Sequence, residues 1–121
     1  MRQATLAAAL SALLGWLAFG PLPAGAHHGW SAYDADNAIK VETKIEAVRY
    51  QNPHGEIDIQ HDGKLWVVVL APPARMQARG LPPEDLQQGT TALIEAYPKR
   101  NGEPEMRAER ITLGGKTIEL R

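Results

Sequence analysis

A period-two alternation over residues 39–47 constrains the fold more than any other feature of this 121-residue chain. In residues 39–47, every odd position holds an apolar residue or a threonine, and every even position holds a lysine or a glutamate. Such a pattern is typical of a strand with one buried and one solvated face, so Glu42 and Glu46 are expected in solvent. The phase is lost at Val48, which predicts a bend or bulge near that point.

Two further strands are predicted directly after this one, because turn sequences separate the apolar segments. Gln51-Asn52-Pro53-His54-Gly55 is a turn, since proline lacks a donor and glycine permits unusual dihedral angles. Residues 56–60 alternate again, and the Asp62-Gly63 pair that follows is a strong signal for a hairpin. The run LWVVVL at residues 65–70 predicts a third strand that is buried on both sides or nearly so.

The remaining elements favour a closed barrel. Pro72-Pro73 opens a short helical stretch and Gly80 closes it, and residues 81–86 predict another single turn. Three strands, a short helix and two or three more strands are the order of an oligonucleotide/oligosaccharide-binding (OB) barrel. We therefore predict a mostly β fold, a small five- to six-stranded OB-like barrel with one short helix between strands 3 and 4. The alternative is an open sandwich of the same strands. The later strands are expected at residues 91–97, 106–113 and 117–120.

The first 26 residues have the order of a secretory signal peptide. Arg2 supplies a basic start, residues 6–19 are mostly apolar, and Ala24-Gly25-Ala26 offers the small residues of a cleavage site. The apolar run is shorter than the ~20 residues of a membrane span, so a retained anchor is the less favoured alternative. We expect a periplasmic or secreted protein with no stable membrane anchor after cleavage. The domain limits predicted are a signal peptide at 1–26, a lead-in segment at 27–38 and a β-barrel domain at 39–121.

Composition excludes several classes of function. The chain has no cysteine, so it has no thiolate metal site, no thiol nucleophile and no disulfide to stabilise a small exported domain. Its formal net charge of −1 argues against a nucleic-acid partner. Ser31 is the sole serine after residue 26, and nothing around it forms a nucleophile elbow. Enzymatic activity is left open, but a binding protein is favoured over an enzyme.

Several short motifs, taken in order, resemble a known family. They are the HHGW sequence of residues 27–30, Asn52-Pro53-His54, Arg79-Gly80 and Leu86-Gln87-Gln88-Gly89. This set resembles a family of small exported bacterial proteins, domain-of-unknown-function family 6152. Members carry a His-His pair after the signal peptide and an Asn-Pro-His motif after a long strand. The family more often has serine where this chain has Gly29. The resemblance implies export and these domain limits, and no activity.

The histidines suggest a copper site. Cleavage after Ala26 would make His27 the first residue, and its amine and ring nitrogen together would chelate one metal ion. An α-amine has a pKa of about 7.7–8.0, so a metal displaces its proton readily near neutral pH. A third nitrogen from His54 or His28 would complete a set that favours Cu(II), similar to the histidine brace of exported copper proteins. In the alternative, His27 and His28 are a solvated terminus, His54 stabilises its turn, and His61 is an exposed hairpin residue.

Three functional hypotheses follow. The first is a Cu(II)-binding protein that uses His27 and His54 as ligands, with His28 as an additional ligand. The second is a metal-independent OB-like module that binds a small molecule, a glycan or a periplasmic protein partner. The third is a copper-dependent oxidoreductase. The aromatic residues predicted to form a ligand surface are Trp30, Tyr33, Tyr50, Trp66 and Tyr97.

Overall fold

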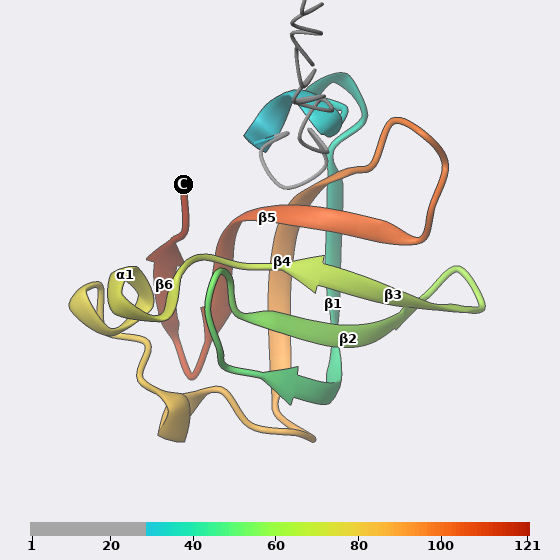
Figure 1. The fold of residues 1–121 in the computed structure, drawn as a ribbon. Helices are drawn as coiled ribbons and strands as arrows, with labels where there is room; N and C mark the ends of the chain where they lie inside the picture. The colour runs from blue at the N-terminus through green and yellow to red at the C-terminus, as the bar shows by residue number, and fades with distance from the viewer. Residues whose placement is uncertain (1–28) are drawn as a thin grey trace, which may run out of the picture.

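Six β-strands and one short α-helix make up the computed structural model, which describes residues 29–121 (Figure 1). Two 3-10 turns, Gly29–Ala32 and Ala35–Asn37, precede the first strand, and a third, Pro83–Asp85, follows the helix. The helix α1 spans Pro73–Ala78 and lies between the third and fourth strands, as predicted. The strands are β1 (Ile39–Arg49), β2 (Glu56–His61), β3 (Lys64–Val69), β4 (Thr91–Pro98), β5 (Glu105–Leu113) and β6 (Lys116–Glu119).

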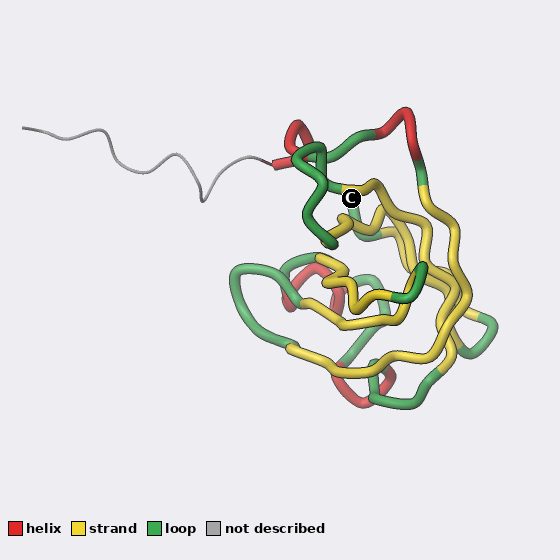
Figure 2. The backbone as a smooth tube through the Cα atoms, turned by 90° about the vertical axis from the view of Figure 1, so that its right-hand side faces the viewer, coloured by secondary structure: helices red, strands yellow, loops and turns green. Residues whose placement is uncertain are grey.

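The sheet closes into a barrel. Its strand order is β3-β2-β1-β4-β5-β6, with antiparallel pairing between neighbours. In addition β3 pairs with β5 in parallel, Val67 opposite Glu105 and Val69 opposite Arg107. This pairing joins the first five strands into a ring, and β6 extends the sheet along the later part of β5 (Figure 2). The closed OB-like barrel is therefore confirmed, and the open sandwich is excluded.

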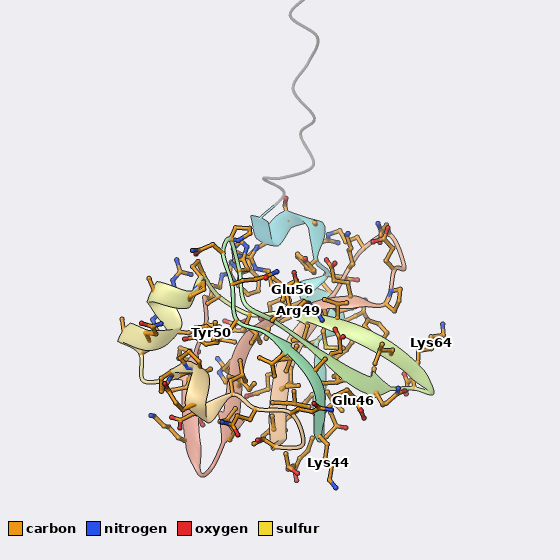
Figure 3. The ribbon with its side chains drawn as sticks, turned by 60° about the horizontal axis from the view of Figure 1, so that its bottom comes forward. Lys44, Glu46, Arg49, Tyr50, Glu56 and Lys64 are labelled. Atoms are coloured by element: carbon orange, nitrogen blue, oxygen red, sulfur yellow. The ribbon has the colours of Figure 1, made fainter. Side chains whose placement is uncertain are left out.

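The first strand follows its sequence pattern closely. Its register against β2 shifts between Ile45 and Ala47, just before the position where the alternation is lost. Glu42 and Glu46 are exposed, as expected for the solvated face of a strand that buries its other side. Figure 3 labels Lys44 and Glu46 in the middle part of this strand and Arg49 at its last residue. The bulge keeps the two halves of this long strand in contact with different neighbours.

The prediction for the third strand was wrong in part. The side chain of Leu65 is 52% exposed, Trp66 is half-buried, and Val68 is the one fully buried residue of β3. The reason lies in the pairing. β5 joins β3 from Val67 onward, so the first half of β3 has a neighbour on one side, β2. An apolar run therefore need not be buried on both faces when half of it lies at a sheet edge.

Apolar side chains from the strands and from α1 fill the barrel, and residues 29–121 bury no charged or polar side chain completely. Met76 is the buried residue of α1, and it packs against this core. No helix among residues 29–121 has the length and apolar character needed to cross a membrane. The largest side chains with almost no exposure are Ile45, Ile57, Ile59, Val68, Leu70, Met76, Leu81, Leu86, Ile94, Met106, Ile111 and Leu120.

Candidate functional site

The turn that carries His54 is anchored by Gly55. The amide of Gly55 donates to the carbonyl of Ala71 at 2.8 Å, and the amide of Leu70 donates to the carbonyl of Gly55 at 2.8 Å. Gly55 is buried, and a Cβ at this position would overlap the Cε atom of Met76. The absence of a side chain thus lets the turn approach α1 closely. His54 is held between this anchor and the cis peptide bond that joins Asn52 to Pro53.

The lead-in segment is bound to the end of β4 and the start of β5. Tyr33 forms an isolated bridge with Lys99, and the amide of Asp34 donates to the carbonyl of Pro98 at 2.8 Å. Tyr33 is 8% exposed, and its hydroxyl donates to Oε2 of Glu105 at 2.6 Å. Burial and this carboxylate raise the pKa of Tyr33 well above its usual range, so the phenol stays protonated. Figure 1 shows the 3-10 turns of this segment above β5.

Trp30 meets two arginines at this end. The guanidinium carbon of Arg107 lies 4.5 Å from the centre of the Trp30 ring system, and that of Arg121 lies 4.7 Å from it. Tyr97 contacts the same ring edge-on, with 5.9 Å between centroids and an interplanar angle of 71°. Cation–π and edge-to-face contacts of this kind favour a defined orientation of the indole. We call the set Trp30, His54, Tyr97, Arg107 and Arg121 the Trp30 site.

His54 belongs to this site through Arg107. Nη2 of Arg107 lies 3.5 Å from Nε2 of His54, and a guanidinium can act only as the donor. Nε2 is therefore the unprotonated nitrogen of the ring in this contact. Burial lowers the pKa of His54, and the charges of Arg107 and Arg75 lower it further, whereas Glu56 opposes them. Burial and the two nearby cations thus favour the neutral form of His54.

The structure brings together some of the predicted site residues and separates others. Trp30, Tyr33 and Tyr97 lie at the lead-in end, joined by the contacts above. Tyr50 instead donates to the carbonyl of Leu81 at 2.7 Å, on the side of α1 (Figure 3). The indole of Trp66 donates to the carbonyl of His61 at 3.1 Å, within the β2–β3 hairpin. The five aromatic residues therefore belong to more than one region of the surface.

His61 is not the freely exposed residue expected from its hairpin. Its side chain is 20% exposed and packs edge-on against Trp66, with 5.5 Å between ring centroids. The cross-strand geometry of the hairpin explains the burial, because His61 and Lys64 are register partners and Trp66 follows two residues later on the same face.

His27 and His28 lie outside the described residues, so the geometry of the predicted copper ligands is not part of this structure. Within residues 29–121, no three His, Cys, Asp or Glu side chains are placed to hold a metal ion. His54 is the one described member of the predicted ligand set. Its Nε2 faces a guanidinium, so a metal ion would have to use Nδ1 or displace Arg107.

Sequence reasoning missed the two arginines of the Trp30 site. Arg107 alternates with Glu105 and Glu109 along the outer face of β5, which looks like an ordinary solvated strand face. Burial by the lead-in segment could not be seen from that pattern. The half-buried state of Arg107 and its contact with Trp30 arise because β5 passes beneath residues that precede β1.

A family profile described as a family of unknown function (DUF6152) matches residues 16–107. The chain belongs to this family. The match includes the turn of His54 and extends through Arg107, the central residue of the Trp30 site. No curated protein matches the chain. Membership of this family confirms the resemblance noted in the sequence and supplies no activity, so the function must be argued from the site itself.

Proposed function

We propose that this protein is an exported binding module that takes up its ligand at the Trp30 site without a resident metal. One observation carries the proposal. The Trp30 ring lies on the barrel surface between contacts with Arg107, Arg121 and Tyr97, rather than in the core. Tryptophan, tyrosine and arginine are the residues enriched where proteins recognise ligands and partners. A rigid β-barrel supports this surface, and rigid support is what a preformed binding site requires.

The location of the ligand site is testable by NMR. The secreted protein, labelled with ¹⁵N, would be titrated with a library of small neutral and charged fragments. We expect the largest shifts at the indole N–H of Trp30 and at the backbone amides of Tyr97 and Arg107. Shifts confined to the pocket lined by Leu81, Leu113 and Ile118, or no shifts at all, would contradict the proposal.

Export is part of the proposal and has its own test. The order of basic start, apolar run and small residues before His27 supports cleavage after Ala26. N-terminal sequencing of protein secreted by a bacterial host should therefore begin at His27. A product that begins at Met1 and stays with the membrane fraction would contradict export.

Cu(II) binding is a second candidate, and one observation favours it. Trp30, three residues after His27 in the sequence, contacts Arg107, and Arg107 contacts the neutral imidazole of His54. A neutral ring with a nitrogen free is the form that binds a metal. The positive charges of Arg107 and Arg121 oppose a dication at the same place. The substitution Arg107→Gln removes one of these opposing charges, so its effect on copper binding tests this candidate.

Copper titration of the processed protein separates the candidates. If His27, His28 and His54 bind Cu(II), His54→Ala reduces the number of nitrogen ligands seen by paramagnetic resonance. Arg107→Gln would then strengthen copper binding, because it removes a cation and frees Nε2. A metal-independent module shows neither effect and keeps its fragment binding in the presence of a chelator. Turnover with oxygen and a reductant after copper loading would identify the copper-dependent oxidoreductase instead.

A further inference from the structure

The outer face of β5 contains an arginine whose acidic neighbours are already engaged. Glu105, Arg107 and Glu109 alternate along this face. The hydroxyl of Tyr33 donates to Glu105, and the hydroxyl of Tyr97 donates to Glu109. Residues two apart on a strand point to the same face, so either glutamate could pair with Arg107. Here two tyrosines occupy those carboxylates, and Arg107 has no ion pair with an acidic side chain of residues 29–121.

Arg107 is also half-buried. Its Nε atom is buried and has no hydrogen-bond acceptor among residues 29–121. Its guanidinium contacts the Trp30 ring and, at 3.5 Å, Nε2 of His54. A buried N–H group of a charged side chain that lacks an acceptor is costly and uncommon in folded proteins. The solvated-face explanation that suits most surface arginines therefore does not apply to Arg107.

Two further cations surround this guanidinium. Burial lowers the pKa of Arg107, Tyr33 opposes this shift, and the charges of Arg75 and Arg121 add to it. Arg75, in α1, donates to the carbonyl of Leu120 at 3.2 Å, which gives it a structural role. Arg121 lies over the Trp30 ring and joins no ion pair with an acidic side chain in the described part of the chain. Two other positive charges that act on Arg107 are unfavourable by themselves, and an anion bound to Arg107 offsets the repulsion.

We propose that the Trp30 site binds an oxyanion, the carboxylate or phosphate group of a small ligand, through Arg107 with Arg121 beside it. A planar guanidinium matches both groups with two parallel N–H···O bonds, which a lysine cannot make. Trp30 and Tyr97 provide flat apolar contact next to the charge, so an aromatic acid would bind better than a bare anion. This inference rests on the proposed function for the location of the site, and it adds the chemical class of the ligand.

The test compares probes that differ in charge and not in shape. The secreted protein would be titrated with benzoate, with neutral benzamide and with inorganic phosphate, while the indole signal of Trp30 and the Nε–H signal of Arg107 are followed by NMR. We expect benzoate to bind at least about tenfold more tightly than benzamide, since a charge-assisted hydrogen bond contributes at least that much. Binding of phosphate alone would also support an oxyanion site and would assign it to phosphate groups.

Two matched arginine variants show which guanidinium binds the anion. Arg107→Gln should weaken benzoate binding about tenfold or more, whereas Arg110→Gln, on the same strand but paired with Glu95 and Glu119, should leave it unchanged. If Arg107→Gln fails to fold, Arg121→Gln at the chain end should still weaken binding severalfold. Equal binding of benzoate and benzamide at Trp30 would overturn the oxyanion proposal and leave the binding module intact. Absence of any shift at this end would overturn both.

Discussion

Because Gly55 has no side chain, the turn that carries His54 can lie close to α1. A Cβ there would overlap the end of Met76, which is fully buried in the core. Gly55→Ala should therefore lower the free energy of unfolding by about 1–3 kcal/mol, because Met76 must leave its present rotamer inside a packed interior. Urea denaturation followed by circular dichroism measures the change.

A second substitution tests that explanation for Gly55. Met76→Leu removes the terminal methyl group that an alanine at position 55 would meet. The cost of Gly55→Ala should then be smaller in the Met76→Leu background than in the wild type, with a coupling of at least about 0.5 kcal/mol. Equal costs in both backgrounds would mean that the glycine is needed for its backbone and not for its contact with Met76.

His54 and Arg107 show what residue-level reasoning could and could not do. The turn around His54 was predicted from Asn52-Pro53 and Gly55, because proline and glycine act locally on the backbone. The partner of His54 was not predicted, since Arg107 is 53 residues away and its own neighbourhood in sequence shows an ordinary strand. Chemistry that depends on two distant side chains is invisible to local patterns.

The lead-in segment is an element without regular strand pairing, held by a few specific contacts. Its amide at Asp34 donates to Pro98, and the amide of Arg100 donates to the carbonyl of Ala32 at 2.9 Å. The ring of Tyr33 is the buried anchor between them. Tyr33→Ala should release this segment, because the remaining hydrogen bonds are few and lie near the surface.

Hydrogen exchange measures the release of the lead-in segment. In Tyr33→Ala the amides of Asp34 and Arg100 should exchange at least about tenfold faster, while the amides of the barrel core keep their protection. Tyr33→Phe is the control, since it keeps the buried ring and loses the hydrogen bond to Glu105. Exchange unchanged in Tyr33→Ala would show that the segment is held by other contacts.

The two halves of β3 should differ in their tolerance of substitution. Leu65 is 52% exposed where β3 has one neighbouring strand, and Val68 is fully buried where β3 pairs with both β2 and β5. Leu65→Thr should change the free energy of unfolding by less than about 0.5 kcal/mol. Val68→Ala should lower it by about 1–3 kcal/mol, because it leaves a cavity in the barrel. Thermal and urea unfolding of both variants would check the contrast.

For the whole molecule, the pKa of His54 links stability to pH. Burial, Arg107 and Arg75 lower its pKa in the folded state below the ordinary value of 6.5, and Glu56 opposes them in part. The unfolded chain therefore binds a proton more readily than the folded one. Stability should be fully present above about pH 6.5 and should fall as the pH drops from there through the lowered pKa of the folded protein.

A neutral replacement isolates this pH effect. His54→Gln should reduce the loss of stability between about pH 6.5 and pH 5 relative to the wild type, measured as the shift in unfolding midpoint. His61→Gln, in the β2–β3 hairpin, serves as the matched histidine control. An identical pH profile in the wild type and in His54→Gln would show that His54 does not carry this dependence.

The sequence by itself determined the local architecture of the barrel. Local signals specify the strands, their turns and the helix between β3 and β4: the alternation over residues 39–47, the Asp62-Gly63 hairpin and the Pro72-Pro73 pair at the start of α1. These signals work because side-chain direction alternates along a strand and because proline and glycine restrict or free the backbone where they stand. They predicted the fold class and misjudged β3, whose burial depends on a strand far away in the chain.

The tertiary structure alone decided which side chains meet at the Trp30 site. Closing the barrel brings β5 beside β3, and the lead-in segment then lies across β5. Trp30, His54, Arg107 and Arg121 meet there from four separate parts of the chain. Their proximity follows from long-range pairing and burial, which no local sequence pattern encodes, and it is this proximity that sets the charge and the chemistry of the site.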